Sequence, residues 1–121
     1  MVKSYEDLLV WQKSMDLVEN IYKLVNLLPK EENFGLAAQM RRAVVSIPSN
    51  IAEGQARQGT KEFINFLSIA NGSKAELRTQ IQICVRLGYI SKTQASGSLA
   101  LCEEIGKMLH SLKAKLQSNA N

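Results

Sequence analysis

The chain has 121 residues, of which 45% are hydrophobic and 21% are charged, and its formal net charge is +4. This length suits one domain, and the composition excludes a disordered chain. The apolar runs are far shorter than the roughly 20 residues that span a bilayer, which excludes a membrane protein. Acidic residues near the start, where a signal peptide would be basic and then apolar, favour a cytoplasmic location.

The first predicted helix covers residues 6–28 and carries two neighbouring apolar stripes. One stripe contains Trp11, Met15, Val18, Tyr22 and Val25, and the other contains Leu17, Ile21, Leu24 and Leu28. Their spacing places each set on one helix face, and the combined width suits a helix that packs against two neighbours. Pro29 ends this helix, because the residue before a proline avoids the helical region.

The second predicted helix begins at Asn33 or Leu36 and runs to Ala56. Its inner face is predicted to contain Leu36, Met40, Ala43, Ile47 and Ile51. Pro48 lies inside this pattern, where it removes a backbone donor and clashes with the carbonyl of Val44, so we expect a kink or a short break there. Gly54 or Gly59 can supply the end of the helix.

A polar stripe also follows the second helix. It consists of Arg42, Ser46, Ser49, Glu53 and Arg57. One interpretation is a binding site or subunit contact. The other is structural: the serines satisfy carbonyls freed by Pro48, while Glu53 bonds Arg57 or Arg42. The stripe alone does not separate the two interpretations.

The third predicted helix has Thr60 as N-cap and Gly88 at C′, just past its end. Its inner face is predicted to contain Phe63, Leu67, Ala70, Leu77, Ile81 and Cys84. Small residues around Gly72 would let another helix approach closely. The fourth helix begins with a capping box of Ser91 and Gln94. Its inner face contains Leu101, Ile105, Met108, Leu112 and Leu116, with Leu109 beside them and a polar tail that frays.

These elements predict an all-α protein with a single domain over residues 1–121. Short connections favour an antiparallel, up-down-up-down four-helix bundle with its core at about residues 5–116. Cys84 and Cys102 are too few for a disulfide framework and are expected to be buried thiols. His110 is the one histidine, and no pair of residues forms a metal-ligand set or a nucleophile–base pair. We therefore expect no metal, no cofactor and no enzymatic activity.

The positive charge is concentrated in the middle of the chain. Residues 1–34 hold four basic and six acidic residues, residues 35–92 hold eight basic and three acidic ones, and residues 93–121 hold three and two. Five of the eight central cations are arginines, which bind phosphate oxygens through two donors at once. One interpretation is a surface for a phosphate backbone; the alternative is a solvated face, partly paired with the acidic first helix.

One long string in the second helix resembles a known family. The string Gln39-Met-Arg-Arg-Ala-Val-Val-Ser-Ile-Pro-Ser-Asn-Ile-Ala-Glu-Gly54 is similar to the hallmark of the small proteins encoded within intervening sequences of bacterial 23S ribosomal RNA genes, often labelled S23 ribosomal proteins. Leu8-Leu-Val-Trp11-Gln12, Phe63-Ile-Asn-Phe-Leu67 and Ala70-Asn-Gly-Ser-Lys-Ala-Glu-Leu77 extend the resemblance to roughly residues 5–112. Ser46, Pro48, Ser49, Asn50, Glu53 and Gly54 form its specific part.

The resemblance implies a four-helix bundle that assembles into a homopentameric ring. It extends in fold to the accessory proteins of diversity-generating retroelements, which bind nucleic acid and a reverse transcriptase, and leaves a reverse transcriptase open as a partner. The leading hypothesis is an oligomeric protein that contacts RNA or DNA phosphates without base readout. The residues predicted to do so are Arg41, Arg42, Arg57, Lys61, Arg78 and Arg86. The alternative hypothesis is a protein–protein scaffold without nucleic-acid binding.

Overall fold

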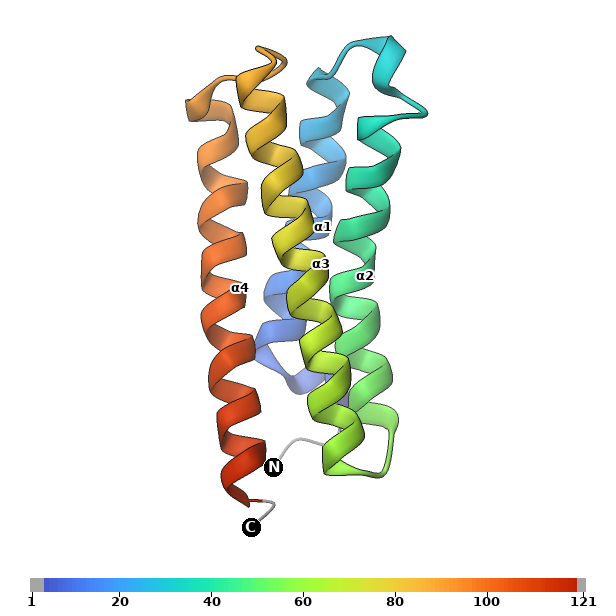
Figure 1. Cartoon of the computed structure of the whole chain (residues 1–121), viewed down its shortest axis with the longest axis vertical. Helices are drawn as coiled ribbons and strands as arrows, with labels where there is room; N and C mark the ends of the chain where they lie inside the picture. Colours follow the sequence, from blue (N-terminus) through green and yellow to red (C-terminus); the bar gives the residue numbers. More distant parts are fainter. Residues whose placement is uncertain (1–3, 120–121) are drawn as a thin grey trace.

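The computed structural model describes residues 4–119 and has four long helices (Figure 1). One 3-10 turn precedes the first long helix, and two more lie in the connection between the first and second long helices. The helices are α1 (Leu9–Leu24), α2 (Leu36–Ala56), α3 (Thr60–Arg86) and α4 (Lys92–Asn119), and the 3-10 turns are Tyr5–Asp7, Val25–Leu27 and Lys30–Glu32. The expected all-α class is thus confirmed. None of the helices in residues 4–119 combines the length and the apolar character that a membrane span requires.

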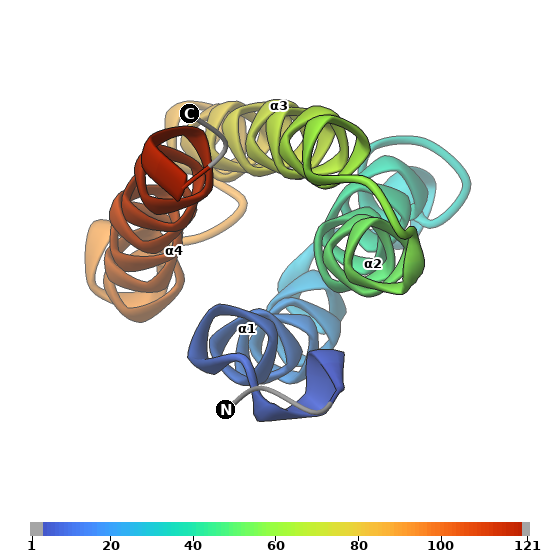
Figure 2. The ribbon, with the colours of Figure 1, turned by 90° about the horizontal axis from the view of Figure 1, so that it is seen from below.

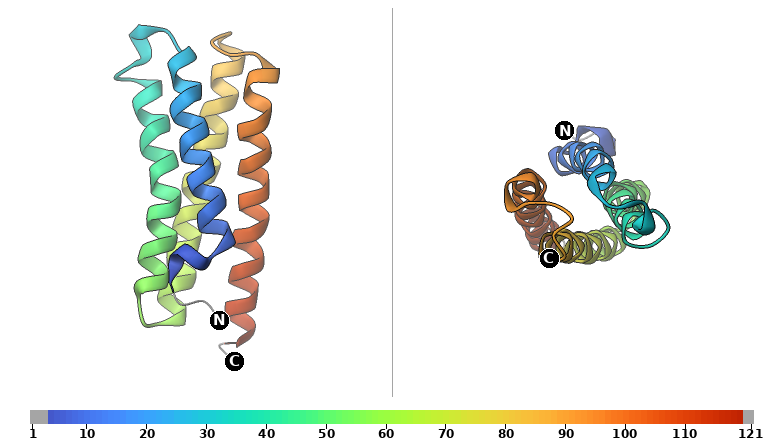
Figure 3. Two further views of the ribbon diagram at one scale, coloured as in Figure 1. Left: turned by 180° about the vertical axis from the view of Figure 1, so that it is seen from behind. Right: turned by 90° about the horizontal axis from the view of Figure 1, so that it is seen from above.

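The four helices form an antiparallel bundle in which each packs against two neighbours. Along the chain, α1 contacts α2, α2 contacts α3 and α3 contacts α4, while α1 and α4 close the ring (Figure 2). Seen from behind, α1 lies between α2 and α4, opposite α3 (Figure 3). This is the up-down-up-down arrangement expected from the short connections.

The core confirms the predicted inner faces of α2 and α3 and one of the two stripes predicted for α1. Leu17, Ile21 and Leu24 are buried, whereas Met15 and Tyr22 are 39% and 44% exposed. The buried stripe of α1 contains Val10, Ser14, Leu17, Ile21 and Leu24. Ser14 is compatible with burial because its hydroxyl donates to the carbonyl of Val10 at 2.7 Å, which leaves no unpaired donor.

The inner face of α4 is also rotated relative to the prediction. Ile105 is fully buried as expected, but Leu101, Met108, Leu112 and Leu116 are half-buried and pack against the edge of the core. The buried stripe of α4 contains Ala95, Ser98, Cys102, Ile105 and Leu109. The helix also continues past Leu116 to Asn119. Cys84 and Cys102 are free and buried, as expected.

The helix ends follow local sequence signals, with one shift. Gly88 has a φ of +77° and accommodates the end of α3, where the amide of Tyr89 donates to the carbonyl of Cys84 at 2.9 Å. The capping box before α4 forms, since Ser91 and Gln94 exchange bonds of 2.9 and 3.0 Å. The N-cap of α3, however, is Gly59, and Thr60 is the first helical residue.

Helix α2 runs through Pro48 without interruption, so the expected break is wrong. Pro48 is buried, which gives its ring apolar contacts that offset part of the cost of the missing donor. Neither glycine considered as a helix end has that role, because α2 ends at Ala56 and Arg57 is its C-cap. Gly54 instead lies buried in the last turn, against α3.

Candidate nucleic-acid interface

The motif of α2 holds α2 against α3 by small residues and hydroxyls. A Cβ atom added at Gly54 would lie 2.6 Å from Cβ of Phe66, so only glycine allows this approach of the two helices. About two turns closer to the N-terminus of α2, the hydroxyls of Ser46 and Ser73 form a hydrogen bond of 2.8 Å. The amide group of Asn50 donates to the hydroxyl and to the carbonyl of Ser46 at 2.9 and 2.8 Å. These residues fix the position of α3 relative to α2.

One interpretation of the polar stripe was that its serines satisfy carbonyls freed by Pro48. The hydrogen bonds of Ser46 do not do so. Ser46 contacts α3 and Asn50 rather than the carbonyl of Val44, and Ser49 is exposed. The expected bond between Glu53 and Arg57 does form, at 3.1 Å. Of the small residues around Gly72 that were expected to let another helix approach, Ser73 does contact α2 through Ser46. Gly72 itself is exposed and has nothing within 4 Å of its added Cβ. The glycine that admits a neighbouring helix is therefore Gly54.

Two of the six predicted phosphate-binding residues are already engaged within the chain. Arg57 forms ion pairs with Glu53 and Glu62, at 3.1 and 3.6 Å, and its guanidinium lies 5.1 Å from the centre of the Phe66 ring. Arg41 donates to the carbonyl of Asn33 at 3.0 Å and so holds the loop before α2. Both side chains therefore already use part of their donor capacity within the chain.

The other four predicted residues are exposed and lie on α2 and α3. Arg42, Lys61, Arg78 and Arg86 are all exposed, and among residues 4–119 none of them forms an ion pair. At 1.5 Å per residue, Lys61 and Arg78 are about 25 Å apart along α3 and Arg86 lies about 12 Å further. Cations spaced in this way are too far apart to converge on one small anion.

Lys74 is a further cation of this surface that sequence analysis missed. It is half-buried, and its Nζ lies 3.0 Å from the position of an added Cβ at Gly106 of α4. Burial raises the pKa of the Cys102 thiol to about 11, and the charges of Lys74 and Arg78 act in the opposite direction. The i, i+4 spacing of Lys74 and Arg78 already indicates that the two side chains are neighbours on α3.

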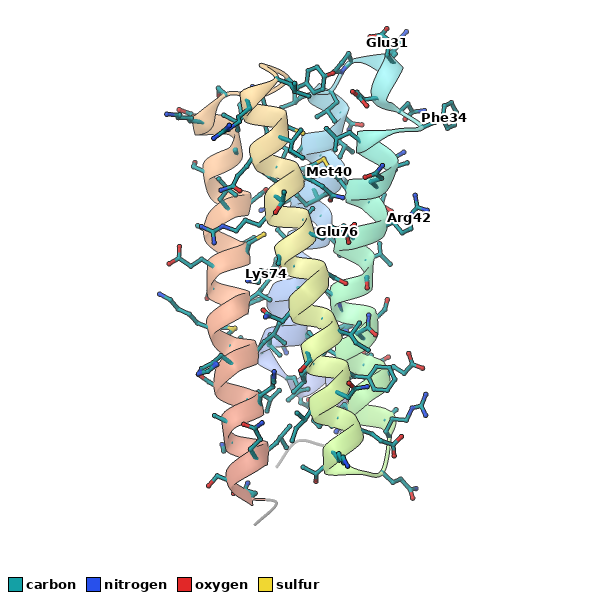
Figure 4. The ribbon with its side chains drawn as sticks, viewed as in Figure 1. Glu31, Phe34, Met40, Arg42, Lys74 and Glu76 are labelled. Carbon is teal, nitrogen blue, oxygen red and sulfur yellow. The ribbon has the colours of Figure 1, made fainter. Side chains whose placement is uncertain are left out.

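We call Arg42, Lys61, Lys74, Arg78 and Arg86 the α3 face. Figure 4 shows Arg42, Lys74 and Glu76 on α2 and α3. The acidic residues of these two helices are Glu53, Glu62 and Glu76, and the first two pair with Arg57. Glu76 is exposed and lines a shallow hollow together with Arg42, Ser46 and Ser73. Glu76 therefore lies beside Arg42, whereas none of the five cations forms an ion pair within residues 4–119.

The described residues offer little for metal chemistry. Within residues 4–119, no group of three or more His, Cys, Asp or Glu side chains could hold a metal ion. His110 is exposed on α4, and burial raises the pKa of Cys84 to about 11, with the charge of Glu32 acting in the same direction. A thiol with such a pKa is a weak nucleophile near neutral pH.

The fold and surface define a small helical-bundle protein with a basic face. The family model described as 23S rRNA-intervening sequence protein matches residues 6–111, and the chain belongs to this family. The crystal structure of a protein of unknown function from the S23 ribosomal protein family of Bacteroides thetaiotaomicron has a similar fold, with a TM-score of 0.80 and 30% sequence identity. The match covers 87% of this chain and 95% of that one. No curated protein matches the sequence.

Proposed function

We propose that this protein is a non-enzymatic, homo-oligomeric accessory protein that binds nucleic acid through phosphate contacts of the α3 face. The observation that carries the proposal is the exposure of Arg42, Lys61 and Arg78 without ion pairs in the described residues. Cations that form no ion pair gain most from a phosphate, because no existing pair has to be broken. The family name supports a connection with ribosomal RNA intervening sequences.

Oligomerisation would strengthen such binding. A pentameric ring, the assembly that the family resemblance implies, would repeat the α3 face in every subunit. Each subunit would add its own phosphate contacts to one bound chain, so weak individual contacts would combine into high avidity. Binding of this kind has no base readout, because the α3 face has no aromatic side chain that stacks on bases.

Fluorescence anisotropy of labelled RNA and DNA oligonucleotides at increasing salt tests the proposal. We expect affinity to fall steeply with salt, with a log–log slope of about −0.9 per duplex phosphate contact. Replacing Arg42 and Arg78 by alanine should weaken binding and reduce that slope by about 1.8 per subunit engaged. A matched control, Lys23→Ala with Lys115→Ala, removes the same charge from exposed positions on α1 and α4 and should leave the slope nearly unchanged.

The second candidate function is a protein–protein scaffold. It is favoured by one observation, the full exposure of a large aromatic side chain, Phe34, which is 94% exposed. If the wild-type protein shows no salt-sensitive binding to any oligonucleotide at low salt, the nucleic-acid proposal is wrong and the scaffold is the better account. Equal effects of the α3-face pair and the control pair would mean that net charge, rather than this surface, determines binding.

A further inference from the structure

Phe34 is the most exposed large hydrophobic side chain among the described residues, at 94%. It lies in the connection between α1 and α2, which extends outward beyond α2 in the view along the bundle (Figure 2). Its side chain points away from all four helices (Figure 4). An aromatic ring in this position gains nothing from the fold of its own chain, and exposed aromatic side chains are frequent anchors of protein interfaces.

The loop that presents Phe34 is held by hydrogen bonds on both sides of it. One carboxylate oxygen of Glu32 accepts from the amide of Leu36 at 3.1 Å, and the other accepts from the hydroxyl of Tyr89 at 2.9 Å. Arg41 binds the carbonyl of Asn33, and the amide of Gly35 donates to the carbonyl of Glu32 at 3.0 Å. Because this loop is already ordered, a contact made by Phe34 would cost little conformational entropy.

A groove that fits an aromatic side chain lies between the C-terminal turns of α3 and the first turns of α4. It has a volume of about 790 Å³, and its apolar residues are Ile83, Val85 and Leu99. Arg86 and Lys92 also line it, together with Thr79, Gln82 and Ser96, and no acidic residue does. The groove therefore combines an apolar surface with two positive charges. We call it the α3–α4 groove.

Phe34 and the α3–α4 groove lie at the same height but on opposite sides of the bundle. Sγ of Cys84 lies 3.6 Å from Sδ of Met40, which places the first turns of α2 level with the last turns of α3. The α1–α2 connection lies beyond α2, whereas α4 lies at the other edge of the molecule (Figure 1). Phe34 cannot reach the groove of its own chain, but a second copy beside it, with its axis parallel, offers the groove at the right height.

We propose that Phe34 of one copy inserts into the α3–α4 groove of a second copy. The loop carries two carboxylates, Glu31 and Glu32, and one cation, Lys30, so its net negative charge complements Arg86 and Lys92 of the groove. The two surfaces differ, so the contact is head-to-tail and leaves one free Phe34 and one free groove at the ends of any open chain. The inference deepens the homo-oligomeric part of the proposed function, since it names the contact between subunits.

The test uses two variants that each remove one side of the contact. Phe34→Ala removes the inserted ring, and Ile83→Lys places a charge in the groove; both residues are exposed enough for the monomer fold to tolerate the change. Ile69→Lys is the matched control, because Ile69 lies on α3 outside the groove and is 44% exposed, against 40% for Ile83. Molar mass is measured by light scattering and sedimentation, without nucleic acid, and circular dichroism checks the fold.

We expect the wild-type protein and Ile69→Lys to be oligomeric, and Phe34→Ala and Ile83→Lys to be monomeric. Mixing the two monomeric variants should give a complex of two subunits and no larger one, because only one intact pair of surfaces remains. A monomeric wild-type protein, a variant of wild-type mass or a mixture that stays monomeric would overturn the proposal. These masses do not depend on oligonucleotide binding, so a failure here and a failure in the anisotropy experiment are distinguishable.

Discussion

The α2–α3 interface and the α1–α4 interface close the same bundle by different means. Between α2 and α3, Gly54 allows the helices to approach closely, and Ser46 bonds Ser73. Between α1 and α4, the contacts include a surface ion pair of 3.6 Å between Lys13 and Glu104, and two hollows remain, one near each end of α1. The first interface depends on specific residue types, whereas the second depends mainly on general apolar character.

The specific packing between α2 and α3 explains why the family motif, Ser46 to Gly54, lies on α2. The close contact at Gly54 tolerates only glycine, and the partly buried hydroxyl pair favours side chains that donate and accept, so these positions restrict the sequence. An apolar surface with hollows tolerates many side chains of similar size. The α2–α3 interface also positions Arg42 relative to the cations of α3, so the residues that restrict the sequence also shape the α3 face.

Replacing Gly54 by alanine should have the largest effect. The added Cβ would lie 2.6 Å from Cβ of Phe66, an atom next to the backbone that cannot move without shifting α3. We expect a loss of about 3 kcal/mol in the free energy of unfolding, measured by urea denaturation. Gly72→Ala is the control, since nothing lies within 4 Å of its added Cβ, and it should gain about 1 kcal/mol. Equal effects of both changes would contradict the account of the interface.

The two cysteines allow the interfaces to be compared by chemical reactivity. Burial raises the pKa of both thiols from 9.0 to about 11. The thiolate fraction at pH 8 should therefore be about 100-fold lower in the folded protein than in the unfolded one, and alkylation slower by at least that factor. Because burial favours the neutral thiol, the two protonated cysteines should contribute fully to the free energy of unfolding below pH 9. That contribution should decrease as the pH rises from 9 toward 11.

Variants with a single cysteine separate the two positions. Cys84 packs against Met40 at the α2–α3 interface, whereas Cys102 belongs to α4. We expect the thiol of Cys102 to react before that of Cys84, because α4 also borders the less specific interface with α1. Faster alkylation of Cys84 would mean that the α2–α3 interface opens first.

The hydroxyl pair of Ser46 and Ser73 should have a moderate effect. A double-mutant cycle with alanine at both positions isolates the bond of 2.8 Å between them. We expect a coupling free energy of about 1 kcal/mol, measured by denaturant unfolding, since the bond is partly buried. A coupling near zero would leave Gly54 as the main source of specificity between α2 and α3.

The ion pair of Lys13 and Glu104 should have the smallest effect. The side chains of Lys13 and Glu104 are 34% and 44% exposed, so water and salt screen their attraction. The same cycle should give a coupling of about 0.3 kcal/mol at low salt, which disappears at high salt. A coupling as large as that of the serines would show that the α1–α4 interface is also specific.

The sequence predicted best what local chemistry determines. The capping box of Ser91 and the C′ position of Gly88 follow from a few neighbouring residues, and both were correct. The inner face of α1 was predicted too wide: Leu17, Ile21 and Leu24 are buried, but Met15 and Tyr22 of the neighbouring stripe are exposed. Ser14 was missed because it looks polar until its bond to Val10 is known. Gly54 was taken for a helix end because its contact with Phe66 depends on how α2 and α3 pack.

The candidate site shows the same limit. The exposed positions of Arg42 and Arg78 agree with their place on the polar sides of the helices. The engagement of Arg57 by Glu62, however, depends on how the connection after α2 turns, which no periodic pattern reports. Phe34 and the α3–α4 groove were missed because each is defined by exposure and by the surrounding surface.

Lysine footprinting with and without a bound oligonucleotide tests the central claim, binding through the α3 face, most directly. Lys61 and Lys74 lie on this face, while Lys23 and Lys115 are exposed on other helices and serve as internal controls in the same molecule. We predict that acetylation, read by mass spectrometry at low salt, decreases at Lys61 and Lys74 when the oligonucleotide is present and is unchanged at Lys23 and Lys115. Equal protection of all four lysines, or protection of Lys23 and Lys115 alone, would contradict binding through the α3 face.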